Sequence, residues 1–345
     1  MIVDIVYGFL GSGKTTFITK VLERWGGDKK TVVLVNEFGD VGIDGELLKN
    51  QGGNVLEMPS GCICCTHQAD FRSQMLEICR TIRPERVIIE PTGVATIAQI
   101  QSIFQAQLFE EVIEKIHNVM IADATGFMGI YKANRHFMES QVKNAHLALL
   151  NKCDKVDKRK AMVTQGAISA INPDITVLMT EFGAVDWGEY QFALATAPDS
   201  GNQITTQSPT NIIQPTDLLG IHSLQTAGSH EHEKGQSRVY FNEEQDALGF
   251  ESFGLEYREV FFDRKRLENL FQKLNVTGSD LGEIVRAKGI FRLDDGWMLM
   301  ELASGEYSCQ PLRVATGTKI SLIGKGINRH LIQAAVDYCI SKGRQ

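Results

Sequence analysis

The chain has 345 residues, a formal net charge of −7, 43% hydrophobic residues and 22% charged residues. This length predicts about two domains, and the composition is that of a globular protein with a sizeable core. The negative charge argues against nucleic acid or an anionic membrane as the main partner, and no stretch is apolar for long enough to span a bilayer. Residues 2–7 lack the basic region and cleavage site of a signal peptide, so we expect a strand there and a cytoplasmic protein.

The first half of the chain alternates between strand and helix patterns. Apolar runs predict buried strands at 2–7, 31–35, 54–57, 86–90, 118–122, 145–150 and 175–179. Helical patterns lie at 14–24, 69–81, 96–105, 135–143 and 157–171. Such alternation is typical of an α/β fold with a mostly parallel sheet, whose ligands bind beyond the carboxyl ends of the strands.

The second half changes character after about residue 187. Residues 195–236 are polar with little periodicity, which predicts a linker or mobile surface segment. A compact pattern then resumes, with strands at 252–262, 283–294, 296–303, 307–313 and 319–324 and helices at 265–274 and 328–341. We therefore expect three parts: a P-loop domain at 1–190, a linker at 191–249 and a smaller α+β domain at 250–345.

A phosphate-binding loop follows the first predicted strand. Gly8, Gly13, Lys14 and Thr15 satisfy the spacing G-x-x-x-x-G-K-[ST]. Glycines bring backbone N–H groups close to phosphate oxygens, Lys14 neutralises the β- and γ-phosphates, and the Thr15 hydroxyl coordinates Mg²⁺. The residues expected to bind nucleotide here are Gly8, Gly11, Ser12, Gly13, Lys14, Thr15 and Thr16. The alternative is a glycine-rich turn with a surface lysine.

An N-K-x-D turn indicates which base is bound. Asn151, Lys152 and Asp154 follow an apolar strand. The Asp154 carboxylate can accept hydrogen bonds from the ring N–H and amino group of guanine, whereas adenine has no such donor pair. Asn151 would tie the turn to the phosphate loop, and the Lys152 stem would cover the base. The alternative is a helix N-cap turn with Asp154 as the cap.

Three cysteines, Cys62, Cys64 and Cys65, lie within four residues. Thiolates at this density suit Zn²⁺ or Cu⁺ and, less often, Co²⁺ or Fe²⁺, and an incomplete ligand set is typical of a metal carrier. Buried cysteines or a redox pair are the alternatives. We interpret the other four cysteines as small core residues: Cys79, Cys153, Cys309 and Cys339.

Two acidic segments complete the predicted site. The glycine-rich run at 36–44 has the character of a switch loop, and Glu37 within it is a candidate Mg²⁺ ligand. Glu90 ends another strand, where its carboxylate can hold a Mg²⁺-bound or attacking water, and the Gly93 N–H can meet the γ-phosphate. We therefore assign Lys14 and Glu90 as catalytic residues. A solvated acidic turn is the alternative for the segment at 36–44.

The order of these motifs resembles the CobW-like metallochaperone GTPases, relatives of the urease- and hydrogenase-maturation GTPases. The matching motifs are GFLGSGKTT at 8–16, NEFGDVGID at 36–44, GCICC at 61–65, ExxG at 90–93, NKCD at 151–154, RAKG at 286–289 and IGKG at 323–326. The resemblance covers nearly the whole chain. It implies slow GTP hydrolysis and delivery of Zn²⁺, Co²⁺ or another transition metal, held by Cys62, Cys64 and Cys65, to a client protein.

Three features depart from the family pattern. Pro91 stands where members have a small polar residue, and Asp40 stands where most have Glu. Where many members have a long histidine-rich stretch, this chain has His222 and the pair His230 and His232. We interpret that pair as solvated, and weak metal binding is the alternative.

We hypothesise that GTP and Mg²⁺ order the switch and cysteine loops into a metal-binding geometry, and that hydrolysis releases the metal. A P-loop kinase or ligase acting on a small molecule is one rival function, and a metal-buffering or regulatory GTP-binding protein is another. No arginine finger is evident, so activation could come from a second subunit of a homodimer or from the client.

Overall fold

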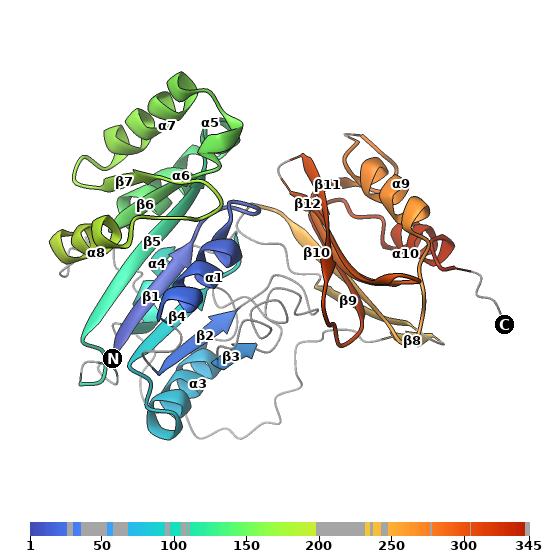
Figure 1. Cartoon of the computed structure of the whole chain (residues 1–345), viewed down its shortest axis with the longest axis horizontal. Helices are drawn as coiled ribbons and strands as arrows, with labels where there is room; N and C mark the ends of the chain where they lie inside the picture. Colours follow the sequence, from blue (N-terminus) through green and yellow to red (C-terminus); the bar gives the residue numbers. More distant parts are fainter. Residues whose placement is uncertain are drawn as a thin grey trace, which may run out of the picture.

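The computed structural model describes residues 1–25, 30–35, 54–57, 68–93, 97–104, 109, 111–197, 232–234, 237–242, 248–276, 278–303 and 305–341. These residues form two seven-stranded sheets, one in each half of the chain (Figure 1). No helix in these ranges is long and apolar enough to cross a membrane.

The first sheet is parallel throughout, in the order β3-β2-β4-β1-β5-β6-β7. Its strands are β1 (Ile2–Tyr7), β2 (Thr31–Val35), β3 (Asn54–Glu57), β4 (Arg86–Glu90), β5 (Lys115–Asp123), β6 (Leu147–Asn151) and β7 (Thr176–Met179). Its helices are α1 (Lys14–Trp25), α3 (Gln68–Thr81), α4 (Ile97–Phe104), α5 (Phe127–Ala133), α6 (Arg135–Lys143), α7 (Lys158–Ile171) and α8 (Trp187–Thr196). The predicted α/β domain is confirmed.

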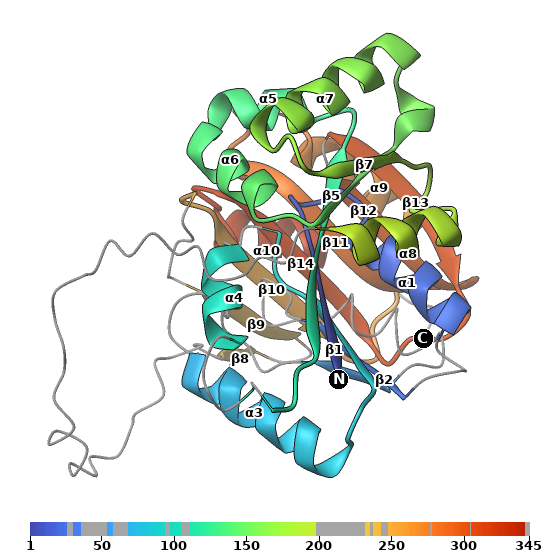
Figure 2. The ribbon, with the colours of Figure 1, turned by 90° about the vertical axis from the view of Figure 1, so that its left-hand side faces the viewer.

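Helices cover both faces of this sheet, which explains why its central strands are continuous apolar runs. Helices α1 and α8 pack on one face around Phe17 and Tyr190. Helices α3, α4, α6 and α7 pack on the other face, around Phe71 and Ile100 among others (Figure 2). Every residue of β2 and β6 is buried as a result.

Two helices of this domain, α5 and α8, were not predicted. In α8 the buried residues are Tyr190, Ala193 and Leu194, whereas Phe192 is exposed. This mixture of buried and exposed apolar side chains hides the helical period. The start of α8 is set by Asp186, whose side chain accepts a hydrogen bond from the backbone N–H of Glu189.

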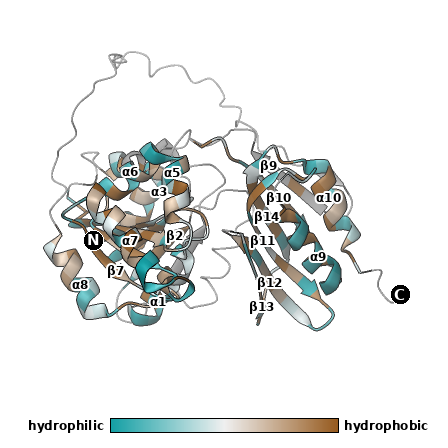
Figure 3. Ribbon diagram, turned by 90° about the horizontal axis from the view of Figure 1, so that it is seen from above, coloured by the Kyte–Doolittle hydropathy of each residue, from teal (hydrophilic) through white to brown (hydrophobic). Residues whose placement is uncertain are grey.

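The second sheet is antiparallel, in the order β13-β12-β11-β14-β10-β9-β8. Its strands are β8 (His232–Lys234), β9 (Ser237–Asn242), β10 (Glu251–Tyr257), β11 (Glu283–Leu293), β12 (Gly296–Ala303), β13 (Glu306–Leu312) and β14 (Thr318–Lys325). Helices α9 (Arg264–Leu274) and α10 (Arg329–Tyr338) lie on the face turned away from the first domain (Figure 3). This arrangement confirms the predicted second α+β domain.

The sheet differs from the sequence prediction at two places. The strand predicted at 252–262 ends at Tyr257, because Glu259 takes a left-handed conformation with φ 54° that turns the chain. Strands β8 and β9 lie between 232 and 242, inside the segment predicted as a linker; β9 pairs with β10, and β8 pairs with β9. The edge strand β8 is polar and only three residues long, so it lacks the apolar alternation by which strands are recognised.

Strand β11 shows how the second sheet separates its two faces. Ala287 and Phe291 are fully buried in the core beneath the helices. Gly289 belongs to the same face, and a Cβ there would lie 2.4 Å from the Phe291 ring, so glycine leaves room for that ring. Arg286 and Lys288 alternate with these residues and lie on the opposite face.

An apolar cluster joins the phosphate loop to the second domain. Leu10 packs with Phe250 and Ile323, and all three are buried. The rings of Phe9 and Phe250 meet edge to face, with centroids 6.4 Å apart. Phe9 and Leu10, the two apolar residues of the loop, therefore pack the loop against the second sheet.

Candidate functional site

The phosphate loop lies between β1 and α1, at the carboxyl edge of the parallel sheet. Gly8 has φ 149° and Gly13 has φ 103°, so both take conformations that favour glycine. A Cβ on Gly8 would lie 2.1 Å from the Ile121 carbonyl oxygen, and one on Gly13 would lie 2.3 Å from the Asn151 side-chain nitrogen. These two glycines are therefore required for packing against β5 and β6 as well as for a close approach to phosphate.

Lys14 and Thr15 begin helix α1 beside Glu90. The Lys14 side chain is buried, and its ammonium donates to the Phe9 carbonyl, with 3.4 Å between nitrogen and oxygen. The Thr15 hydroxyl donates to a Glu90 carboxylate oxygen at 3.0 Å. Gly93 lies against the loop, where a Cβ would be 2.7 Å from the Leu10 nitrogen. The structure thus brings together the predicted Mg²⁺ ligand Thr15 and the predicted water-holding residue Glu90.

Asn151 links the N-K-x-D turn to the phosphate loop, as the sequence predicts. Its side-chain nitrogen donates to the Ser12 carbonyl at 2.9 Å. Its side-chain oxygen accepts from the Gly183 N–H at 3.0 Å and from the Thr180 hydroxyl at 3.2 Å. The buried amide therefore fixes three segments at one edge of the sheet.

Asp123 holds Lys152 in place, and the sequence interpretation did not identify it. Lys152 has a left-handed backbone with φ 61°, and its ammonium lies 2.7 Å from an Asp123 carboxylate oxygen. Burial raises the pKa of Asp123, but hydrogen bonds from Lys152 and Thr125 and the Lys152 charge outweigh it, so the pKa lies below its usual value. The available signal was an acidic residue at the end of an apolar strand.

Phe182 is a second residue that the sequence interpretation missed. Its side chain is 67% exposed and borders the same cavity as Lys152 and Asp154. Its backbone has φ 53°, which is rare for a bulky residue. The following Gly183 fits closely against the Phe17 backbone and donates to Asn151, so the turn that carries Phe182 is held on both sides.

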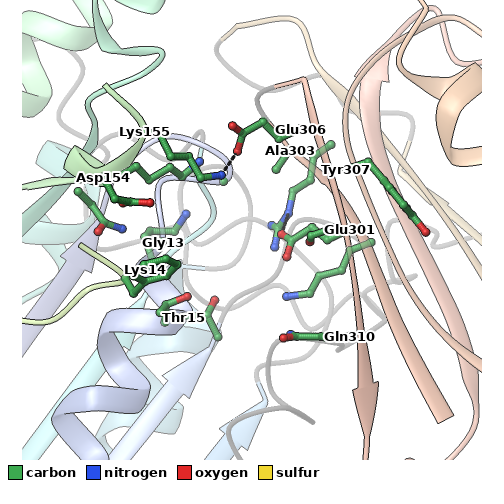
Figure 4. Close-up of a pocket in the computed structure, with 18 of the residues that line it drawn as sticks. Gly13, Lys14, Thr15, Asp154, Lys155, Glu301, Ala303, Glu306, Tyr307 and Gln310 are labelled. Atoms are coloured by element: carbon green, nitrogen blue, oxygen red, sulfur yellow. Dashed lines mark hydrogen bonds and ion pairs between the residues drawn. The ribbon is translucent and has the colours of Figure 1, made fainter. Parts of the chain in front are cut away.

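A cavity of about 730 Å³ lies between the two domains. The first domain contributes Gly11, Gly13, Lys14, Thr15, Thr16, Glu90, Asn151, Lys152, Asp154, Lys155 and Phe182. The second contributes Arg286, Lys288, Glu301, Ala303, Glu306, Tyr307, Ser308 and Gln310. In Figure 4, Glu301 and Gln310 extend toward Lys14 and Thr15, and Glu306 forms an ion pair with Lys155.

The lining residues fit a nucleoside triphosphate with Mg²⁺. The volume lies within the range of roughly 300–1,000 Å³ typical of small-molecule sites. The glycine loop, the start of α1 and Lys14 form an anion site, and the Thr15 hydroxyl is an oxygen ligand suited to Mg²⁺. Asp154 lines the same cavity, together with Lys152. The described residues can therefore hold both groups.

The predicted metal-binding cysteines Cys62, Cys64 and Cys65 lie outside the described residues, as do Glu37, Asp40, His222 and His230. Within the described ranges, no three His, Cys, Asp or Glu side chains are grouped to hold a metal ion.

The interpretation of the remaining cysteines is correct only in part. Cys339 is buried, Cys79 and Cys153 are half-buried, and Cys309 is exposed. Cys309 lies on β13, at one edge of the second sheet, in register with the buried Met300, so its exposure comes from its place on the edge strand.

Comparison with known proteins identifies two domains. Residues 2–179 match the family model of the CobW/HypB/UreG nucleotide-binding domain, and residues 250–340 match the cobalamin synthesis protein cobW C-terminal domain. Zinc chaperone YeiR of Escherichia coli K12 is 33% identical over 183 residues, which cover 53% of this chain and 56% of that protein. Zinc-regulated GTPase metalloprotein activator 1 of Dictyostelium discoideum is 24% identical over 327 residues, which cover 83% of this chain and 62% of that protein.

The chain thus spans less than two thirds of the length of these curated relatives. Among solved structures, the Zn(II)-bound YjiA GTPase of Escherichia coli is 18% identical with a TM-score of 0.43, covering 98% of both chains. The family model matches more than half of the chain, from β1 to β7. The chain therefore belongs to the CobW/HypB/UreG family of nucleotide-binding domains and carries a CobW C-terminal domain.

Proposed function

We propose that this protein binds GTP with Mg²⁺, hydrolyses it slowly, and carries a transition metal to a client protein. The observation that carries the GTP assignment is the hydrogen bond from Asn151 to the Ser12 carbonyl. It joins the N-K-x-D turn directly to the phosphate loop, and both line one cavity, as one nucleotide bound to both would require. We also propose that residues 1–190 and 250–345, extended by β8 and β9, act as two domains around that nucleotide.

The base would be recognised at the end of the cavity lined by Asp154. Its carboxylate offers two acceptor oxygens to the donor pair of guanine, and adenine would leave these acceptors without partners. The Lys152 stem, held by Asp123, and the Phe182 ring border the same space and suit the two faces of a planar base. This arrangement supports guanine selectivity.

Hydrolysis would use Lys14, Thr15 and Glu90. Lys14 would neutralise charge on the β- and γ-phosphates, and Thr15 would supply a hydroxyl ligand to Mg²⁺. Glu90 is buried and accepts a hydrogen bond from Thr15, which leaves its carboxylate beside the phosphate loop where it would orient the attacking water. Water forms the new bond to the γ-phosphorus, and the bond to the bridging oxygen of GDP breaks.

Metal carriage would use Cys62, Cys64 and Cys65, whose thiolates suit Zn²⁺ or Co²⁺. Two kinds of relatives are named zinc chaperone and zinc-regulated GTPase metalloprotein activator, which supports a metal cargo and a client protein. The nucleotide and the metal would each favour the same arrangement of the loop at 36–44. Linkage then requires each ligand to tighten the binding of the other by the same factor.

Binding measurements test the nucleotide assignment. Wild-type protein should bind GTP at least a hundredfold more tightly than ATP, and Asp154→Ala should remove most of that preference. Asp157→Ala is the matched control, because Asp157 caps α7 and does not line the cavity. Equal affinity of the wild type for both nucleotides would contradict guanine selectivity.

Metal titrations test the cargo. Zn²⁺ and Co²⁺ affinities should be higher with a non-hydrolysable GTP analogue than with GDP, and Cys→Ser changes at 62, 64 and 65 should remove binding. Equal affinities in the two nucleotide states would contradict the coupling. GTP-dependent turnover of a small molecule that persists in the triple Ser variant would favour a kinase or ligase instead.

A further inference from the structure

The second domain turns a polar sheet face toward the phosphate loop. On β11, the core-facing residues alternate with Arg286 and Lys288, which line the cavity together with Lys14 and Thr15. The RAKG motif at 286–289 therefore has a divided role. Two of its residues build the core of the second domain, and its two cations face the nucleotide-binding domain.

Lys288 is only 4% exposed, although its side chain is charged. Removing an ammonium group from water is costly unless anions accompany it. Lys288 pairs in register with Glu301 on β12, and the Arg286 guanidinium lies 3.8 Å from a Glu301 carboxylate oxygen. Glu306 on the same wall pairs with Lys155. Lys288 and Arg286 line the same cavity as Lys14, so an anion held by the phosphate loop would lie between cations from both domains.

The position of the two cations indicates which part of the nucleotide they meet. Figure 4 shows Glu301 and Gln310 opposite Lys14 and Thr15, whereas Glu306 lies opposite Lys155 and Asp154. Lys288 lies directly opposite Glu301 on the neighbouring strand. It therefore belongs to the part of the cavity wall that faces the phosphate loop.

We propose that Lys288 and Arg286 form the second half of the phosphate site and contact the terminal phosphates of GTP bound in the loop at 8–15. This inference rests on the proposed GTP-binding function. It assigns to the second domain a direct role in binding nucleotide. Loss of the γ-phosphate would remove an anion from between the two domains, so the second domain distinguishes the triphosphate from the diphosphate.

Nucleotide affinities of charge-removing variants test the proposal in the full chain. Lys288→Met keeps the stem and removes the ammonium, and Arg286→Gln removes the guanidinium charge. Each should weaken binding of a non-hydrolysable GTP analogue about tenfold or more, as expected for a lost charge-assisted hydrogen bond. GDP binding should change less than threefold, and Lys288→Arg should restore most of the affinity for the analogue.

Arg292→Gln is the matched control. Arg292 lies on the same strand but stacks on Phe261 and Trp297, outside the cavity, so its change should leave both affinities unaltered. Equal weakening of GDP and the analogue, or unchanged binding of both, in well-folded Lys288→Met and Arg286→Gln would overturn the inference while leaving GTP binding intact. A wild-type protein that binds no guanine nucleotide would instead overturn the proposed function, and this inference with it.

Discussion

At the scale of single residues, buried polar side chains determine the shape of the site. Asn151 uses both ends of its amide to join three segments, and Asp123 fixes Lys152 beside it. A second buried carboxylate, Asp4, pairs with Arg86 and His117 at the other end of the sheet. Removing a partner of any of these groups destabilises the protein, because a charge or an amide is then buried without a partner.

Asp123→Asn should destabilise the protein by about 3 kcal/mol at neutral pH, because it breaks a buried ion pair. The pKa of Asp123 is lowered in the folded state, so its contribution is complete above the unfolded-state pKa of about 4. The contribution is lost as the pH falls through the lower, folded pKa. Urea unfolding of both proteins should therefore show a difference at pH 7 that shrinks below about pH 4.

Glu139→Gln is the control for this experiment. Glu139 pairs with Arg135 on the surface of α6, where the pair is screened by solvent, so this change should have a much smaller effect at any pH. A difference between wild type and Asp123→Asn that stays constant down to pH 3 would contradict the electrostatic explanation.

Phe182→Ala should weaken GTP and GDP binding alike, because both nucleotides carry the same base. Loss of one base-stacking ring costs about 1–3 kcal/mol. Phe182→Tyr should keep the affinity, and Phe192→Ala removes an equally exposed ring from α8 as a control. Weakening confined to GTP, or an effect of Phe192→Ala as large as that of Phe182→Ala, would argue against stacking.

At the scale of elements, the phosphate loop is a packing element as well as an anion site. Its Leu10 lies in a cluster with Phe250 and Ile323 of the second sheet. The Lys325 ammonium lies 4.9 Å from the centre of the Phe250 ring and extends this contact. The loop conformation and the position of the second sheet are therefore stabilised by the same side chains.

Phe250→Ala should lower the free energy of unfolding by about 3–5 kcal/mol, as for other buried Phe truncations. It should also weaken GTP binding, because Leu10 loses part of its support. Phe261→Ala is the control, since that ring is partly exposed and packs under Arg292 instead of the loop. Destabilisation without any change in GTP affinity would show that the cluster does not support the loop.

At the scale of the whole molecule, the nucleotide cavity is walled by both domains. A ligand that binds only the folded state stabilises it by about 2.7 kcal/mol at a hundred times its dissociation constant. Because walls from both domains would contact the same ligand, this stabilisation should be shared between them.

Hydrogen exchange measures how far a bound nucleotide stabilises each of the two domains. A non-hydrolysable GTP analogue should slow exchange in β11 and β12 of the second domain as well as in the phosphate loop and β6. The amides of β8 and β9, on the far side of the second sheet, are an internal control and should change least. Protection limited to the first domain would contradict a shared site.

The sequence by itself determined the parts of this protein that depend on local patterns of residues. Contiguous apolar runs predicted the parallel strands, and fixed spacing predicted the phosphate loop and the Asn151–Asp154 turn. The alternation in β11 also has the period that a strand requires. The cysteine motif at 62–65 remains a prediction of the same kind, because it lies outside the described residues.

Only the tertiary structure decided which distant residues share the cavity. Asp123 reaches Lys152 because parallel strands β5 and β6 are neighbours, and Phe182 enters because a strained turn after β7 carries it to the same edge. Lys288 lies 274 positions after Lys14, and the docking of two sheets brings both to one cavity. The periodicity of a sequence indicates which side of a helix or strand is buried. Which residues meet across a domain interface depends instead on how two separately folded surfaces fit together.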